Sequence, residues 1–281
     1  MRVTALLVWL LVTAIPAAAL AGSARMELAL APDRVAEADY WPGAADMPAV
    51  LILHGFLQTR EFPAIRRLAQ ALADEGFSVL TPTLSLGLNR RRQSLACEAV
   101  HTHTLEQDVA ELSTWTRWLA GRTGRAPVVI GQGVGGIQLA AMLDARETPV
   151  DRALLVDMNA FQQRPSGAPG VAHPAVAGDA HGIAIYRLGY CARYASTVAA
   201  SGSYLAWDRD RVQRVLLALE APVTLVSGGD DTRVGTDWMR ALEAGGVELR
   251  TIPGVDHFFD LAHASELLDE VLRVITETNH G

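Results

Sequence analysis

Short apolar runs alternate with longer amphipathic segments along most of the chain. The run Ala49–Leu53 (AVLIL) precedes a segment, residues 61–75, in which Ile65, Leu68 and Leu72 recur at helical spacing. Further apolar runs lie at 77–84, 128–130, 153–157, 223–227 and 247–252, and helical patterns lie at about 104–120, 135–146 and, for about 16 residues, from 261. This alternation predicts an α/β fold with a mostly parallel sheet and helices on both faces.

Residues 159–206 interrupt the alternation. They contain the turn-rich runs RPSGAPG and HPAVAGDAHG and the tyrosine-rich run YRLGYCARYAS. We expect an insertion that folds over the carboxyl edge of the sheet as a lid, and not a separate domain. Residues 22–281 are accordingly predicted to form one domain of about 260 residues, which is within the range of single α/β domains.

The first 21 residues are predicted to be a signal peptide. Arg2 is followed by the apolar run ALLVWLLVTAI, and Ala19 and Ala21 form an A-x-A cleavage site. A membrane span needs about 20 apolar residues, and this run is broken at Pro16. Cleavage after Ala21 leaves a periplasmic or secreted chain without a transmembrane segment, and an uncleaved anchor is the alternative.

Two cysteines, Cys97 and Cys191, are an even pair in a chain with these export features. An oxidising compartment favours a disulfide between them. Closing so long a loop removes about 4–5 kcal/mol of unfolded-state entropy in the chain-entropy model. Two free buried thiols are the alternative.

The overall charge makes nucleic acid an unexpected partner. The formal net charge is −7, and no basic block is present to neutralise phosphates. The run Arg90-Arg91-Arg92 is the one local basic cluster. We interpret it as part of a solvated loop.

Polar and glycine-rich turns follow four of the predicted strands. They are His54–Leu57 (HGFL), Gly131–Gly135 (GQGVG), Gly228–Asp231 (GGDD) and Pro253–Phe259 (PGVDHFF). Ligands of open α/β sheets bind beyond the carboxyl ends of the strands. The four turns therefore predict one shared site.

In this order the turns resemble those of the α/β-hydrolase superfamily, and the resemblance covers nearly all of the chain after residue 21. That family orders its catalytic triad as nucleophile, acid and histidine. The resemblance implies His257 as general base and Asp231 as acid, with Asp230 a close second. Asp157, at the end of ALLVD, is a further alternative acid, although capping of the next segment is also compatible with its position.

The same resemblance implies an oxyanion loop beginning at His54. In that loop the backbone N–H of Phe56 or Leu57, together with the N–H of Val134, would face a developing negative charge. No cofactor is implied.

The nucleophile position departs from the family pattern. Gly131 and Gly135 match the glycines of the family's G-x-S-x-G turn, but Gly133 replaces the serine and Gln132 stands where many members have histidine. Glycine tolerates the strained backbone of such a turn, so we expect the turn to form. It cannot form an acyl intermediate.

Several other side chains are candidates for the same pocket. The run CEAVHTH places His101 and His103 near the predicted cleft, as pocket-lining residues or, with Glu98, as metal ligands. We favour the pocket-lining role and predict no metal site. The aromatic side chains of the insertion either line an apolar site, with Tyr190 a candidate, or pack the lid on the core; they are Tyr186, Tyr190, Tyr194, Tyr204 and Trp207.

Two functions remain open on the sequence alone. The first is a hydrolase-like pseudoenzyme that binds a small apolar or acyl ligand or is vestigial. The second is an enzyme in which His257 and Asp231 act on water or a substrate proton, with an ester or other acyl substrate. Ordinary serine-hydrolase activity would require the nucleophile turn to lie elsewhere in the chain.

Overall fold

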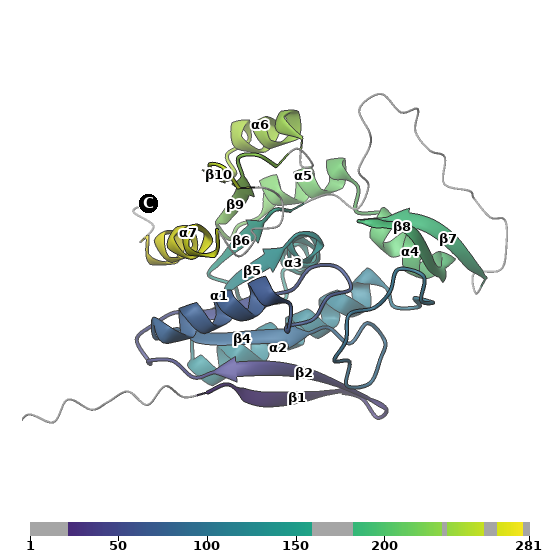
Figure 1. The fold of residues 1–281 in the computed structure, drawn as a ribbon, viewed down its shortest axis with the longest axis horizontal. Coiled ribbons are helices and arrows are strands. Elements are labelled where there is room, and N and C mark those ends of the chain that lie inside the picture. The colour runs from purple at the N-terminus through teal and green to yellow at the C-terminus, as the bar shows by residue number, and fades with distance from the viewer. Residues whose placement is uncertain (1–21, 159–181, 232–234, 256–262, 278–281) are drawn as a thin grey trace, which may run out of the picture.

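The fold is built on one eight-stranded sheet, seen in a computed structural model that describes residues 22–158, 182–231, 235–255 and 263–277 (Figure 1). The strands are β1 (Ala24–Ala31), β2 (Arg34–Trp41), β3 (Ala49–Leu53), β4 (Ser78–Thr83), β5 (Val128–Gln132), β6 (Arg152–Val156), β9 (Val223–Gly228) and β10 (Glu248–Ile252). Their order is β1-β2-β4-β3-β5-β6-β9-β10. From β4 to β10 all neighbours are parallel, whereas β2 is antiparallel to both β1 and β4.

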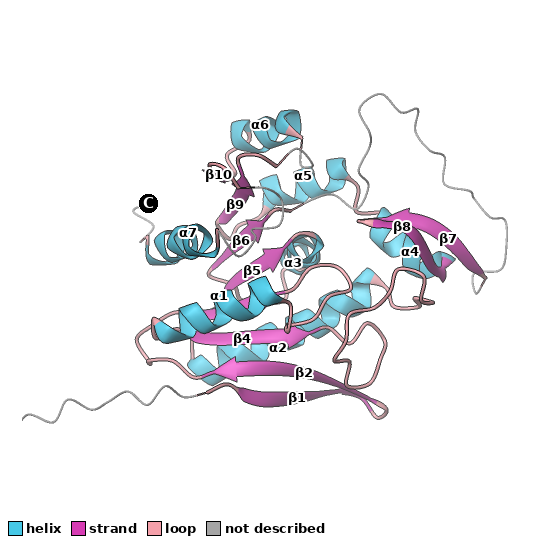
Figure 2. Cartoon of the chain, viewed as in Figure 1, coloured by secondary structure: helices cyan, strands magenta, loops and turns pink. Residues whose placement is uncertain are grey.

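Helices cover both faces of the sheet (Figure 2). One face carries α1 (Pro63–Asp74) and α7 (Ala264–Thr276), and the other carries α2 (Leu105–Thr123), α3 (Val134–Asp144), α5 (Arg209–Ala218) and α6 (Thr236–Ala244). Strand β3 shows how one sequence serves two cores. Leu51 and Leu53 belong to the α2–α3 side, while Val50 and Ile52 belong to the α1–α7 side, because successive strand side chains point to opposite faces.

The α/β architecture predicted from the apolar runs is confirmed. Local signals placed several boundaries within a few residues. Helix α1 begins at Pro63, where proline suits the first helical turn, and α2 begins after a capping box formed by Thr104 and Gln107.

A separate two-stranded hairpin lies within the predicted insertion. It consists of β7 (Ile183–Leu188) and β8 (Cys191–Thr197), and α4 (Val198–Leu205) follows it. Figure 1 shows this hairpin at the periphery, beyond the carboxyl ends of the central strands. Residues 159–181 of the insertion and the predicted signal peptide lie outside the described residues. Within the described ranges, no helix combines the length and apolar character needed to cross a membrane.

Candidate functional site

The sheet brings the predicted site residues to one edge. Gly131 on β5 pairs with Leu53 on β3, and on its other side with Leu155 on β6. Because the three strands are parallel, the residues that follow them emerge side by side. His54, Gly133 and Asp157 therefore leave the sheet at the same carboxyl edge.

A single residue, Gly133, connects β5 to α3. Its φ of 56° and ψ of −123° lie in a region that residues with a side chain rarely adopt. A Cβ built on Gly135 would lie 2.5 Å from the carbonyl oxygen of His54, and one on Gly131 would lie 2.8 Å from the Gly136 nitrogen. Among the residues that the structure describes, none has a heavy atom within 4 Å of a Cβ built on Gly133.

The positions of this turn therefore favour glycine for different physical reasons. Close packing fixes Gly131 and Gly135, whereas only the backbone conformation favours glycine at position 133. No described residue fills the space beside the Gly133 Cα. The N-terminus of α3, whose first N–H groups have no intrahelical acceptor, begins at the next residue.

His54 forms a hydrogen bond through each of its ring nitrogens. Its Nδ1 donates to the Gly55 carbonyl over 2.8 Å, and its Nε2 accepts from the Leu84 N–H over 3.2 Å. This pattern assigns a neutral ring protonated at Nδ1. Burial, assisted by the nearby charge of Arg91, lowers the pKa of His54 to about 3. The imidazole is thus a neutral structural link between β3 and the loop after β4.

Arg91 is buried beneath the same loop, so the interpretation of the arginine run as solvated was wrong for this residue. Its guanidinium donates to the carbonyl oxygens of Leu57 (3.2 Å), Gln58 (2.6 Å) and Leu84 (2.6 Å). Burial lowers its pKa to about 10, which leaves it charged at neutral pH. Sequence reasoning missed this residue because a run of three arginines gives no sign of which one points inward.

The neighbours of Arg91 in the run point outward to a different partner. Arg90 and Arg92 both form ion pairs with the buried carboxylate of Glu37 on β2, and Arg60 reaches it from the other side at 3.5 Å. The hydrogen bond from Arg92 lowers the pKa of Glu37. Arg90 and Arg92 therefore brace the N-terminal strands, while Arg91 braces the predicted oxyanion loop.

Two candidate acids lie at the carboxyl edge. Asp157 is buried, with a φ of 47°, and its Oδ1 accepts from the Gly228 N–H over 3.3 Å. Asp231 is half-buried in the turn after β9. The neighbouring Asp230 donates its N–H to the carbonyl of Val255 over 3.0 Å, so this turn contacts the segment that leads to His257. His257 itself lies outside the described residues, and its pairing with Asp231 stays a prediction.

The β7–β8 hairpin covers Phe56 of the predicted oxyanion loop. A Cβ on Gly189, in the hairpin turn, would lie 3.5 Å from the Phe56 ring and 3.7 Å from the Val134 side chain. The Tyr190 hydroxyl donates to the Phe56 carbonyl over 2.9 Å. Cys97 and Cys191 form the predicted disulfide, which ties the hairpin to the loop that precedes α2.

The two candidate histidines lie behind this hairpin. The His101 ring stacks on Tyr194 with a centroid distance of 4.3 Å, and burial, with the neighbouring His103, lowers its pKa. His103 lies with its Nδ1 2.7 Å from the Tyr204 hydroxyl, which donates to Asp108. Both rings are buried. Across the described ranges no cluster of three His, Cys, Asp or Glu side chains has the geometry of a metal site.

Most of the aromatic side chains of the insertion pack inward. Tyr186, Tyr194, Tyr204 and Trp207 are buried, whereas Tyr190 is exposed. The Phe56 ring lies 5.6 Å from Tyr194 and 5.7 Å from Tyr204, between centroids. These contacts are those of the packing alternative, and they connect the insertion directly to the oxyanion loop.

Two buried carboxylates of α2 were missed from the sequence. Asp108 accepts from Gln138 of α3 over 2.7 Å, and Glu111 accepts from the backbone and side chain of Ser85. Burial, the largest effect, raises the pKa of Glu111 to about 7. A signal was available, because both acids fall on the helix face that also holds Leu112 and Trp115.

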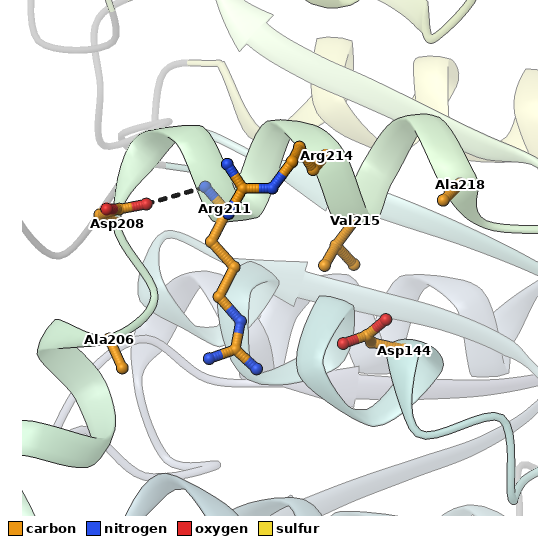
Figure 3. Close-up of a pocket in the computed structure, with 7 residues that line it drawn as sticks. All are labelled: Asp144, Ala206, Asp208, Arg211, Arg214, Val215 and Ala218. Atoms are coloured by element: carbon orange, nitrogen blue, oxygen red, sulfur yellow. Dashed lines mark hydrogen bonds between the residues drawn. The ribbon is translucent and has the colours of Figure 1, made fainter.

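An open hollow of about 600 Å³ lies away from the glycine turn, between the C-terminal end of α3 and α5 (Figure 3). Asp144 and Arg211 line it, and the Arg211 guanidinium lies 4.3 Å from the Trp207 ring centroid. Asp144 is the last residue of α3, which begins beside Gly133. At 1.5 Å per residue, the two ends of this helix lie about 16 Å apart. We do not assign this hollow to the site, because it holds none of the predicted groups.

Comparison of the sequence with protein-family models and with curated proteins gives no match. Comparison of the structure gives matches that cover most of the chain. The thioesterase domain from the curacin biosynthetic pathway has a TM-score of 0.64 at 16% identity, covering 90% of this chain and 99% of its own. Est1E from Butyrivibrio proteoclasticus has a TM-score of 0.63 at 16% identity, covering 92% of this chain and 100% of its own.

A third similar structure is the α/β hydrolase GrgF from Penicillium sp. sh18, with a TM-score of 0.63 at 13% identity. The match covers 90% of this chain and 97% of GrgF. At these identities the likeness concerns the fold and not the activity. Together with the mostly parallel sheet and its helices on both faces, it shows that the chain has the α/β-hydrolase fold.

Proposed function

We propose that this is an exported, hydrolase-like pseudoenzyme that binds a small acyl or ester ligand without forming a covalent intermediate. The observation that carries the proposal is Gly133. It has the backbone conformation of a tight strand-to-helix turn, beside the N-terminus of α3, and no described residue fills the space where a nucleophile would project. A site of this form offers N–H donors to a carbonyl or carboxylate oxygen, but no attacking group.

The surroundings of the turn support binding. His54 and Arg91 hold the oxyanion loop from below, and the hairpin contacts Phe56 from above. Each of these contacts reduces the freedom of the loop before a ligand arrives, which favours binding through preorganisation. One similar structure, Est1E from Butyrivibrio proteoclasticus, is known with ferulic acid bound, and this agrees with an acyl-type ligand here.

The disulfide supports export. Disulfides persist in the periplasm and outside the cell and are rare in the cytosol, and Cys97–Cys191 joins residues 94 positions apart. With the N-terminal apolar run, this favours a periplasmic or secreted protein.

The second function, a His257–Asp231 dyad that acts on water, is favoured by one contact. The Asp230 N–H to Val255 carbonyl hydrogen bond joins the acid turn to the segment that leads to His257. A dyad in this place would have the oxyanion loop nearby, and binding with an oxyanion hole alone retains about 10³–10⁴-fold acceleration in a serine protease without its triad.

Hydrolysis of p-nitrophenyl esters of increasing acyl length separates the two functions. For the pseudoenzyme we expect no turnover by the wild type, together with a rise in melting temperature when the corresponding free fatty acids are added. Turnover that disappears in His257→Ala would establish the dyad instead. If the protein shows no turnover and no ligand-dependent rise in melting temperature, both functions are excluded.

Restoring the nucleophile tests the geometry of the turn. Gly133→Ser adds a side chain into open space at a backbone cost of about 1–3 kcal/mol, and we expect it to acquire esterase activity that His257→Ala abolishes. Gly135→Ser is the matched control, because its Cβ would meet the His54 carbonyl at 2.5 Å. A folded Gly133→Ser variant without activity would mean that the predicted acid and histidine do not complete a triad.

A further inference from the structure

The outer face of the β7–β8 hairpin is apolar and exposed. Ile183 and Ile185 on β7 are 50% and 47% exposed. The segment before α2 lies beside β8, where His101 forms a parallel bridge with Ser196. His101 faces inward onto Tyr194, so the preceding Val100, 61% exposed, faces outward.

The inner face of the same hairpin packs against the core. Tyr186, Leu188 and Tyr194 are buried, and the disulfide through Cys191 and the Tyr190 hydrogen bond hold the turn. The outer face is therefore presented by a fixed scaffold. Its exposed isoleucines are not explained by a role in lid packing.

The charge of this face is opposite to that of the whole protein. Arg187 continues the outward-facing series of Ile183 and Ile185, and Arg193 lies on the neighbouring strand; both are exposed. The hairpin, Ile183–Thr197, contains no acidic residue, although the chain has a net charge of −7. The exposed Glu98 lies two positions before Val100 in the chain.

Exposed aliphatic side chains flanked by arginines fit one kind of partner. Branched apolar side chains partition into the boundary between lipid head groups and acyl chains, and arginines are attracted to anionic head groups. An exposed apolar cluster with a charged rim is also the usual mark of an interaction surface.

We propose that the outer face of this hairpin, formed by Val100, Ile183, Ile185, Arg187 and Arg193, adsorbs the protein to the surface of an anionic lipid bilayer. The hairpin stays closed during adsorption, because its inner face and disulfide are unchanged. The bilayer holds the protein peripherally and takes no part in the chemistry of the glycine turn. The inference therefore stands or fails independently of the proposed ligand binding.

Co-sedimentation with vesicles tests the proposal, using the chain from Gly22, because the apolar run before it would partition into lipid by itself. We expect binding to phosphatidylcholine vesicles that contain phosphatidylglycerol, and much weaker binding to phosphatidylcholine alone. Binding should weaken as salt rises from about 50 to 300 mM, since the Debye length shortens. No binding to the anionic vesicles at low salt would overturn the proposal.

Variants assign the binding to this face. Arg187→Gln and Arg193→Gln should each weaken binding about fivefold, and Ile185→Ser by a similar factor, because about half of its side chain is free to be buried. Arg240→Gln on α6 and Leu217→Ser on α5, both exposed, are the matched controls and should bind as the wild type does. Equal effects of the controls and the hairpin variants would overturn the assignment.

The same proteins are compared by analytical ultracentrifugation without lipid. We expect monomers of the wild type and of Ile185→Ser. A wild-type dimer that Ile185→Ser dissociates would show that the face binds a second copy, and the lipid proposal would then be wrong.

Discussion

Replacing Glu111 by glutamine tests the effect of a buried carboxyl on stability. Burial raises the pKa of Glu111 from 4.5 to about 7. Between these values the folded state binds the proton more tightly than the unfolded state, so the contribution of this group to stability is fully present below pH 4.5. It is lost as the pH rises through about 7.

The size of the effect follows from the two pKa values. A difference of about 2.5 pKa units corresponds to about 3 kcal/mol over the full titration. Most of it, about 2.5 kcal/mol, falls between pH 5 and pH 8. Glutamine does not titrate, so Glu111→Gln should gain about that much stability relative to the wild type over this range.

The hydrogen bonds to Ser85 change little with pH in this comparison. The glutamine Oε1 can still accept from the Ser85 N–H, and any lost bond costs about 1 kcal/mol at every pH. That cost shifts the whole difference curve and leaves its slope unchanged.

Urea denaturation at pH 5, 6, 7 and 8, followed by tryptophan fluorescence, measures the difference in unfolding free energy between variant and wild type. Glu243→Gln, on the exposed side of α6, is the matched control. A difference for Glu111→Gln that is the same at pH 5 and pH 8 would refute the reasoning, since it would mean that Glu111 is ionised in the folded protein throughout.

Three further predictions concern other parts of the fold. Burial depresses the pKa of His54 from 6.5 to about 3, so this group contributes stability that is present above pH 6.5 and lost as the pH falls toward 3. His54→Gln should therefore lose less unfolding free energy than the wild type between pH 7 and pH 5, by about 2 kcal/mol. Equal losses in the two proteins, measured by urea denaturation at both pH values, would contradict this. Replacing Cys97 and Cys191 together by serine should lower the unfolding free energy by about 4–5 kcal/mol on the chain-entropy model, and adding a reductant should bring the wild type to the same value; a reductant-resistant difference would point to packing and not to the cross-link. Expression in a secreting bacterial host should release a chain whose N-terminal residue is Gly22, which N-terminal sequencing of the released protein checks, and a chain that keeps residues 1–21 would exclude cleavage.

Parallel strands and their turns were the predictable part of this fold. Runs such as Ala49–Leu53 are apolar at every position because helices cover both faces of the sheet. The hairpin β1–β2 was not predicted, since β2 carries the buried Glu37 and the partly buried Asp39 and so lacks an apolar run. The charge on Glu37 is acceptable there only because arginines from distant segments converge on it.

The site shows the same division between local and distant causes. Glycines that follow a strand predict a tight turn, because the requirement is local. The burial of Arg91 and the contact of Tyr190 with Phe56 depend on segments far apart in sequence, and no pattern around either residue indicates its partner. Asp108 and Glu111 are intermediate: the sequence pattern could predict that they lie on the buried face of the helix, but it could not predict which residues they contact.

The open space at Gly133 also makes the protein convenient for chemical labelling. The chain has two cysteines, and both form the Cys97–Cys191 disulfide. A Gly133→Cys variant would therefore carry a single free thiol at the start of α3, where no atom of the described part of the chain crowds its Cβ. A fluorophore or spin label attached there would report directly on molecules that enter the turn, in a protein that needs no other cysteine to be removed first.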